Sequence, residues 1–136
     1  MAVVEELIRG EADGSISFGN HQLDQKAKKE DFPCGGAVYK VKTFSTMTKL
    51  EKDGAFAYES VPGTSVTGFK TSDEGVSFTV EGEEDAQLTL GLEEDTEYGV
   101  VIDGEDAGKV KTNLSGKLSI SVELNPGQEV RVEIKK

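Results

Sequence analysis

Regular alternation of apolar and polar residues over the C-terminal part of the chain is the feature that most limits its fold. Successive side chains of a β-strand point to opposite faces of a sheet, so a period of two predicts antiparallel strands with one buried and one solvated face. We expect seven apolar side chains with this period to face one core: Leu118, Ile120, Val122, Leu124, Val130, Val132 and Ile134.

Dipeptides that favour tight turns separate similar runs along the rest of the chain. They supply the positive or preset φ angles that sharp reversals need. The dipeptides are Asp13-Gly14, Asp53-Gly54, Pro62-Gly63, Glu74-Gly75, Asp103-Gly104, Ser115-Gly116 and Pro126-Gly127. Besides the two final strands, we predict strands at 38–44, 46–52, 55–60, 65–70, 76–80, 88–92, 98–102 and 109–112.

The N-terminal region is more ambiguous. The apolar residues of 3–8 fit one face of a helix ended by Gly10, and they equally fit the first arm of a hairpin whose second arm holds Ile16 and Phe18. We prefer the hairpin because everything downstream has the β period. Residues 20–37 are polar and are then interrupted by proline and glycine, so we predict a long loop there.

Ten to twelve short strands at close, regular spacing are typical of β-sandwiches and barrels. Twelve strands are too many for a small closed barrel that side chains can fill. We therefore predict an all-β fold, an antiparallel two-sheet β-sandwich of jelly-roll type, in a single domain over residues 1–136. The C-terminal half, about 76–135, is the most regular part, and we expect it to form a meander.

The net charge of −11 is unevenly distributed along the chain. Residues 71–108 hold 13 of the 26 acidic residues and no lysine or arginine, whereas residues 1–70 hold 10 acidic and 9 basic residues. Nucleic acids and anionic membranes bind basic faces, so neither is an expected partner. We interpret the acidic segment as solvated loops; a docking face for a basic protein partner and a weak cation site are the alternatives.

The N-terminal sequence MAVVEELIRGEADG has glutamates where a signal peptide needs a basic region, and no apolar run has the length of a membrane span. The only cysteine, Cys34, excludes an intrachain disulfide and agrees with a reducing compartment. We therefore expect a cytoplasmic protein.

Residue types that usually carry catalysis are scarce. His21 is the only histidine, which excludes a metal site with two or more histidines. A Ser-His-Asp triad around His21 has no nucleophile-elbow sequence to support it, and the setting Gly-Asn-His-Gln indicates a polar turn. We predict Cys34 to be an accessible loop thiol, with a Cys34/His21 dyad as the alternative. No residue is assigned a catalytic, cofactor-binding or metal-binding role, and no cofactor is expected.

Carboxylates are numerous, but their number alone does not make a site. The segment Asp103 to Asp106 resembles part of a calcium loop without its 12-residue spacing, so we interpret it as a type I′ hairpin turn. A glycosidase pair needs two carboxyl groups about 5–10 Å apart in a sugar-sized cleft. The chain has no tryptophan and only Tyr39, Tyr58 and Tyr98 as tyrosines, which leaves little aromatic surface for stacking sugar rings.

Four segments resemble a group of short bacterial proteins often labelled "endosialidase": YKVKTF (39–44), TKLEKDGAFAYESVPGT (48–64), VSFTVEGEEDAQLTLGLEEDTEY (76–98) and KTNLSGKLSISVEL (111–124). The resemblance extends over nearly the whole chain and implies glycoside processing. Sialidases bind the sugar carboxylate with several arginines and use a tyrosine nucleophile. Because Arg9 and Arg131 are the only arginines here, an arginine triad cannot be built within one subunit, and the activity does not carry over.

Two classes of function remain. The residues favour a non-catalytic β-sandwich that acts as an interaction or assembly module and is not an enzyme; a carbohydrate-binding or glycoside-processing protein is the alternative. Residues 38–41, 56–58 and 100–102 place apolar side chains on both faces of their strands, although a sandwich buries only one face of each sheet. We therefore expect a homo-oligomer, a dimer or trimer, joined through a sheet face or edge.

Overall fold

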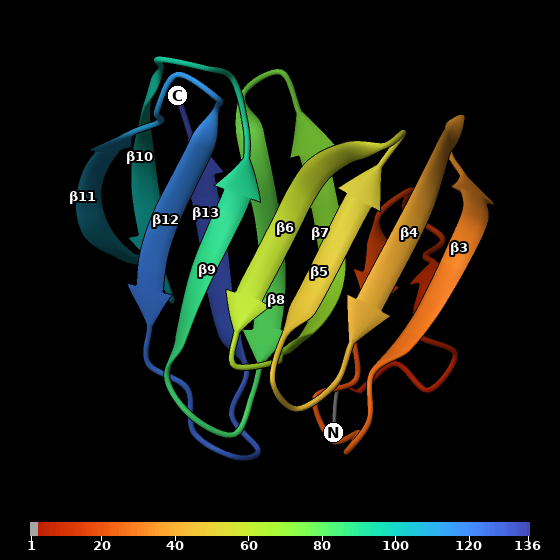
Figure 1. Ribbon diagram of the computed structural model, residues 1–136. Coiled ribbons are helices and arrows are strands. Elements are labelled where there is room, and N and C mark those ends of the chain that lie inside the picture. The colour runs from red at the N-terminus through yellow and green to blue at the C-terminus, as the bar shows by residue number, and fades with distance from the viewer. Residues whose placement is uncertain (1–2) are drawn as a thin grey trace.

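The computed structural model describes residues 3–136 and shows two antiparallel sheets stacked face to face (Figure 1). Sheet A contains, in spatial order, β1 (Ile8–Gly10), β2 (Ile16–Phe18), β7 (Ser65–Ser72), β8 (Gly75–Glu81), β13 (Val130–Lys135), β10 (Glu97–Ile102) and β11 (Glu105–Lys111). Sheet B contains β12 (Lys117–Val122), β9 (Ala86–Gly91), β6 (Ala55–Val61), β5 (Thr48–Lys52), β4 (Ala37–Thr43) and β3 (Ala27–Cys34). The predicted all-β, two-sheet sandwich is confirmed, while the jelly-roll connectivity stays a prediction.

Residues 3–136 contain thirteen strands and no helix. It follows that no helix in this range is suited to crossing a membrane. The number of strands is one more than the predicted maximum of twelve, and the strand that was not predicted is β3.

The connections between strands differ from the predicted C-terminal meander. Strands β3 to β6 are neighbours in chain order, so the meander lies in the N-terminal half of the chain. From β8 onward every connection except the β10–β11 hairpin crosses to the other sheet. The meander prediction was wrong because a period of two shows which side chains are buried but not which strand lies beside which.

Apolar side chains from both sheets form the core, and four aromatic rings lie together within it. Tyr58 of sheet B packs edge-on against Phe18, Phe69 and Phe78 of sheet A, with ring centroids 5.3, 6.1 and 5.6 Å away. Edge-to-face aromatic contacts of this kind add to the hydrophobic gain of burial. Tyr58 therefore joins the two layers.

The prediction that the alternating apolar residues of 118–134 face the core is largely confirmed. Six of its seven apolar residues are buried, and Ile120 is half-buried. Ile120 lies on β12, the last strand of sheet B, where no further strand covers its outer side. Its edge position thus explains the one departure from the expected pattern.

Two of the three Asp-Gly dipeptides, Asp53-Gly54 and Asp103-Gly104, form tight hairpin turns, as predicted. Both residues have positive φ in each: 52° and 80° at Asp53-Gly54, 51° and 80° at Asp103-Gly104. Two positive φ values are characteristic of the type I′ turn. The aspartate side chains also bind neighbouring strands, because Oδ1 accepts a hydrogen bond from the Val38 N–H in the first and from the Arg131 N–H in the second.

The N-terminal region confirms one prediction and corrects another. β1 and β2 pair as a hairpin, so the helix alternative is excluded. The loop predicted at 20–37 was wrong, because Ala27–Cys34 forms β3. β3 is an edge strand that is largely exposed, with only Phe32 and Cys34 packed against the core, and its Pro33 is tolerated there because an edge strand leaves N–H groups unpaired.

Two substitutions test the burial pattern. We expect Leu88→Ala in β9, where the side chain is fully buried, to lower the free energy of unfolding by about 2–5 kcal/mol. Ile120→Ala should cost less than about 2 kcal/mol, because the side chain is already half-exposed. Urea denaturation measures both, and equal losses would contradict the edge position of Ile120.

Candidate functional site

A network of buried hydroxyl groups closes one end of the sandwich, with Thr64 at its centre. The Thr64 Oγ1 lies 2.7 Å from the Tyr58 hydroxyl and 2.8 Å from Ser60 Oγ. Thr48 Oγ1 donates to the Thr64 carbonyl (2.8 Å) and accepts from the Thr64 N–H (3.1 Å). Among the described residues no buried side-chain nitrogen or oxygen lacks a partner, so this network satisfies the polar groups of the core.

Tyr58 is the residue of this network that bears on catalysis. Its side chain is fully buried, and burial raises the pKa of the Tyr58 hydroxyl well above its ordinary value. A protonated hydroxyl without access to solvent cannot act as a nucleophile. Tyr98 is buried as well, so two of the three tyrosines are also unable to stack against a sugar.

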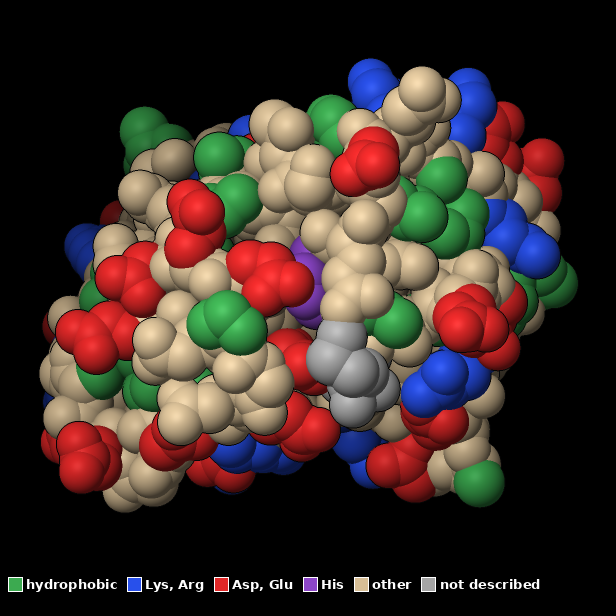
Figure 2. All heavy atoms as spheres, turned by 90° about the horizontal axis from the view of Figure 1, so that it is seen from below, with side chains coloured by type: hydrophobic (Ala, Val, Ile, Leu, Met, Phe, Trp, Pro, Cys, Tyr) green, Lys and Arg blue, Asp and Glu red, His purple; other side chains and the backbone are tan. Residues whose placement is uncertain are grey.

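His21 lies at the same end of the molecule, beside Ser65 and Glu83. Its Nδ1 is 2.7 Å from Ser65 Oγ, and its Nε2 is 3.8 Å from Glu83 Oε1. The imidazole is buried, whereas 54% of the Glu83 side chain is exposed. Figure 2 shows part of the histidine among acidic side chains in the view of this end.

The arrangement brings together a serine, a histidine and a carboxylate, but it is not a hydrolytic triad. In such a triad the serine contacts Nε2 and the carboxylate contacts Nδ1. Here the two contacts are exchanged, and Ser65 is fully buried, so its hydroxyl cannot meet a substrate. The polar turn predicted around His21 is present, because the Leu23 N–H donates to the Asn20 carbonyl (3.4 Å) and the Gln22 N–H donates to Asn20 Oδ1 (3.0 Å). The turn is buried at His21, whose hydrogen bonds to Ser65 join it to the start of β7.

Burial lowers the pKa of His21 below its ordinary value of 6.5, and the carboxylates of Glu83 and Glu81 oppose this shift. The folded protein therefore favours the neutral imidazole. When the pH falls below 6.5, the unfolded chain binds a proton at His21 that the folded chain takes up only at lower pH. His21 thus contributes stability above pH 6.5 that is lost as the pH falls through the lowered pKa.

Cys34 lies in β3 and is half-buried, so its predicted place in a loop was wrong. Its Sγ is close to β1: a Cβ added to Gly10 would be 2.9 Å from it. His21 bonds to Ser65 and faces Glu83, and no contact in residues 3–136 joins it to Cys34. The reactivity of the thiol stays a prediction.

The arginines and carboxylates do not converge on a reaction centre. Arg9 in β1 pairs with Glu6 and Glu11, whereas Arg131 in β13 lies near Glu133, and three strands separate β1 from β13 in sheet A. Within the described chain no group of three or more histidine, cysteine, aspartate or glutamate side chains is placed to hold a metal ion. The Asp103 segment is a hairpin turn, as predicted.

The edges of the sheets offer a different kind of site. Short strands and bulges protect edges from pairing with other chains. β1 has only three residues, and β3 and β11 each contain a register shift against their neighbours. β12 has neither feature, because its six residues pair with β9 in continuous register. β12 is therefore the regular edge of the sandwich.

The register of β12 shows which backbone groups are free. The Leu92 N–H donates to the Gly116 carbonyl (2.8 Å), one position before the Lys117–Gly91 pair. Bonded residues alternate along an antiparallel ladder, so Ile120 bonds to β9 and the N–H and C=O groups of Ser119 and Ser121 point to the open side.

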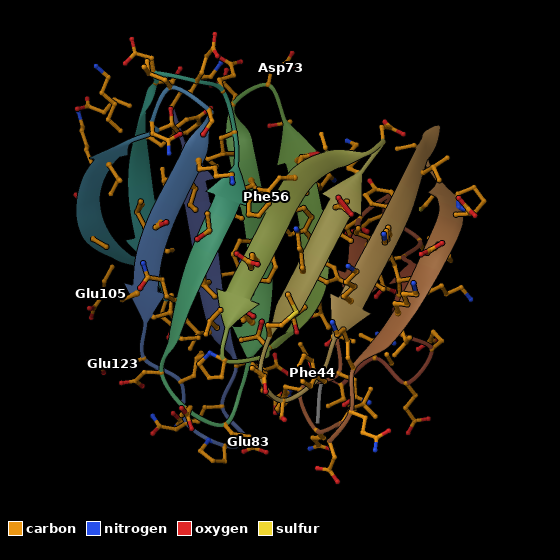
Figure 3. All side chains as sticks on the ribbon, viewed as in Figure 1. Phe44, Phe56, Asp73, Glu83, Glu105 and Glu123 are labelled. Carbon is orange, nitrogen blue, oxygen red and sulfur yellow. The ribbon has the colours of Figure 1, made fainter. Side chains whose placement is uncertain are left out.

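Behind this edge, the last strand of sheet A is left uncovered by sheet B. In Figure 1, β11 of sheet A extends past β12, and no strand of sheet B covers it. The half-buried Val110 of β11 is paired with the buried Tyr98, so it faces the interior side of sheet A. Glu105 and Glu123 lie near the lower end of β12 (Figure 3), and the carboxylate of neither forms a hydrogen bond or ion pair with a described residue.

The titration of the single histidine tests the environment at the closed end. We expect the NMR midpoint of His21 below 6.5, because its imidazole is buried. Glu83→Gln should lower the midpoint further, because it removes a charge that favours the imidazolium, and Glu84→Gln serves as the matched control. A midpoint at or above 6.5, or equal shifts in both variants, would contradict this assignment.

The sequence matches no family model, and neither the curated proteins nor the solved structures contain a match to it.

Proposed function

We propose that the protein is a non-catalytic interaction module that binds an extended segment of a partner protein along β12. The observation that supports this proposal is the unequal size of the sheets, seven strands in sheet A and six in sheet B. β1 and β3 contact each other at one end of the stack, and β11 at the other end has no counterpart. A strand added beside β12 would supply that counterpart.

The free edge provides both affinity and register. The outward N–H and C=O groups of Ser119 and Ser121 would bond to the added strand, as in other complexes formed by β-strand addition. Alternate side chains of that strand would cover Ile120 and Val110, which are half-exposed without it. An alternating apolar pattern in the partner segment satisfies both requirements.

Charge indicates that the partner segment is basic. The chain carries a net charge of −11, and the free carboxylates of Glu105 and Glu123 lie at one end of the edge. A lysine or arginine in the bound segment would meet these carboxylates. Attraction between exposed charges is screened by salt, so binding should weaken as ionic strength rises.

A second copy of the chain is the other source of an added strand, and a dimer or trimer stays a prediction. Like charges of −11 repel, so self-association should strengthen with salt, in contrast to binding of a basic segment. Light scattering at two salt concentrations separates the cases. A mass of 14.6 kDa at both would contradict self-association.

The endosialidase resemblance, a carbohydrate ligand and a cytoplasmic location also stay predictions. Tyr58 and Tyr98 are buried, so Tyr39 is the most exposed of the three tyrosines, and it is itself half-buried. Strand binding is therefore the better supported proposal.

A synthetic peptide of alternating lysine and valine, eight residues long, tests strand binding. We expect its addition to shift the backbone amide resonances of β12 and β11, because these strands flank the open position. A peptide of alternating glutamate and valine should bind more weakly, because it meets the same carboxylates with like charge. Two-dimensional NMR titration at low and high salt measures both.

Variants of the edge provide the controls. Ser119→Pro removes an outward N–H and should weaken binding of the lysine peptide, whereas Ser119→Thr keeps the N–H and should not. The double substitution of Glu105 and Glu123 by glutamine should weaken binding and reduce its salt dependence. Resonance shifts confined to other strands, or unchanged binding by folded Ser119→Pro protein, would overturn the proposal.

A further inference from the structure

An apolar hollow lies between the sheets at the end opposite the hydroxyl network. It has a volume of about 210 Å³ and is lined chiefly by Ala57, Phe69, Val76, Leu90 and Leu92. The β5–β6 and β7–β8 turns lie at this end, and Figure 3 marks it with Asp73. The hollow differs from the edge of β12 in chemical character, because its walls are apolar side chains of both sheets, whereas the edge presents unpaired backbone groups.

A bulge in β6 accounts for the space. The register of β5 against β6 shifts between Leu50 and Glu51, so Ala57 is the extra residue on β6. Regular alternation from Tyr58 would turn the ring of Phe56 inward. The ring instead lies near two lysines, with its centroid 4.7 Å from Lys117 Nζ and 5.9 Å from Lys49 Nζ. The small side chain of Ala57 is left on the interior side.

One cation stands at the rim of this hollow. Thr48 and Leu50 of β5 are buried, and Lys52 continues their period of two, so it faces the space between the sheets and lines the hollow. In the described part of the chain no carboxylate lies within ion-pair distance of Lys52.

The groups around Lys52 do not neutralise it. Tyr39 is paired opposite Lys52, and burial raises the pKa of the Tyr39 hydroxyl, which stays neutral. The adjacent Asp53 carboxylate accepts the Val38 N–H in the hairpin turn. Thr71, another lining residue, adds a hydroxyl group.

We propose that this hollow binds a small amphipathic carboxylate, with the apolar body between the sheets and the carboxylate at Lys52. An engineered apolar cavity of about 150 Å³ accepts benzene, so 210 Å³ has room for an apolar body of about eight carbons. A charged hydrogen bond from Lys52 fixes the polar end, and the Thr71 hydroxyl is a further polar group of the lining. This inference does not depend on strand binding at β12.

Octanoate is the probe, and 1-octanol is its uncharged counterpart. We expect octanoate to bind with a dissociation constant of about 1 mM or lower and to shift the amide resonances of Val76, Leu90 and Leu92. Lys52→Gln should weaken octanoate binding about three- to tenfold and leave octanol binding unchanged. Lys49→Gln, on the outer face of the same strand, is the matched control.

A filling substitution tests the position of the apolar body. Ala57→Leu should abolish binding of both probes, and Ala57→Val is the smaller alternative if the first variant does not fold. Absence of saturable octanoate binding to the wild-type protein would overturn the proposal. Equal loss in the Lys52 and Lys49 variants would overturn the role of Lys52, and binding retained in folded Ala57 variants would overturn the position of the site.

Discussion

The packing of Tyr58 between the two sheets is the contact on which the rest of the structure depends. Its ring meets Phe18, Phe69 and Phe78 of the opposite sheet, so it contributes directly to the apolar core. Its hydroxyl meets Thr64 Oγ1 and is thereby tied to the polar network at one end. A buried tyrosine needs a partner for its hydroxyl, and Thr64 of the network supplies it. The closed end is therefore a structural feature, although it holds the histidine and serine that a catalytic reading would select.

Two departures from regular sheet geometry give the molecule its open sites. Sheet A has one strand more than sheet B, which leaves β11 uncovered and the edge of β12 exposed. Edge strands expose unpaired backbone groups, and β12 has neither the shortness of β1 nor the bulges of β3 and β11. The second departure is the bulge at Ala57, which turns Phe56 outward and leaves a hollow under Lys52. One irregularity exposes backbone and the other exposes apolar surface, so the two sites suit different ligands.

The distribution of charge supports both sites in different ways. Two acidic residues of the C-terminal half, Glu105 and Glu123, lie near the open edge, and their carboxylates have no partner among the described residues. Lys52 has the opposite charge: it is a cation without an ion pair beside an apolar hollow. A charge without a partner at the margin of a site favours a ligand of opposite sign. The edge therefore favours a basic segment, and the hollow favours a carboxylate.

The all-β class, nearly all strand positions and the Asp-Gly turns could be predicted from the sequence, because alternation and turn chemistry are local properties. β3, whose exposed edge position leaves no apolar alternation, was not predicted, and the meander was placed in the wrong half. Neither proposed site was predictable in detail. Lys52 continues the period of Thr48 and Leu50, which indicates that it faces the interior, but no local sequence feature indicated the hollow beside it. The order of strands, the free edge of β12 and the contact of His21 with Ser65, 44 residues apart, are set by the folding of the whole chain. Such pairings join segments far apart in the chain, and they depend on how whole sheets stack rather than on the residues next to each position.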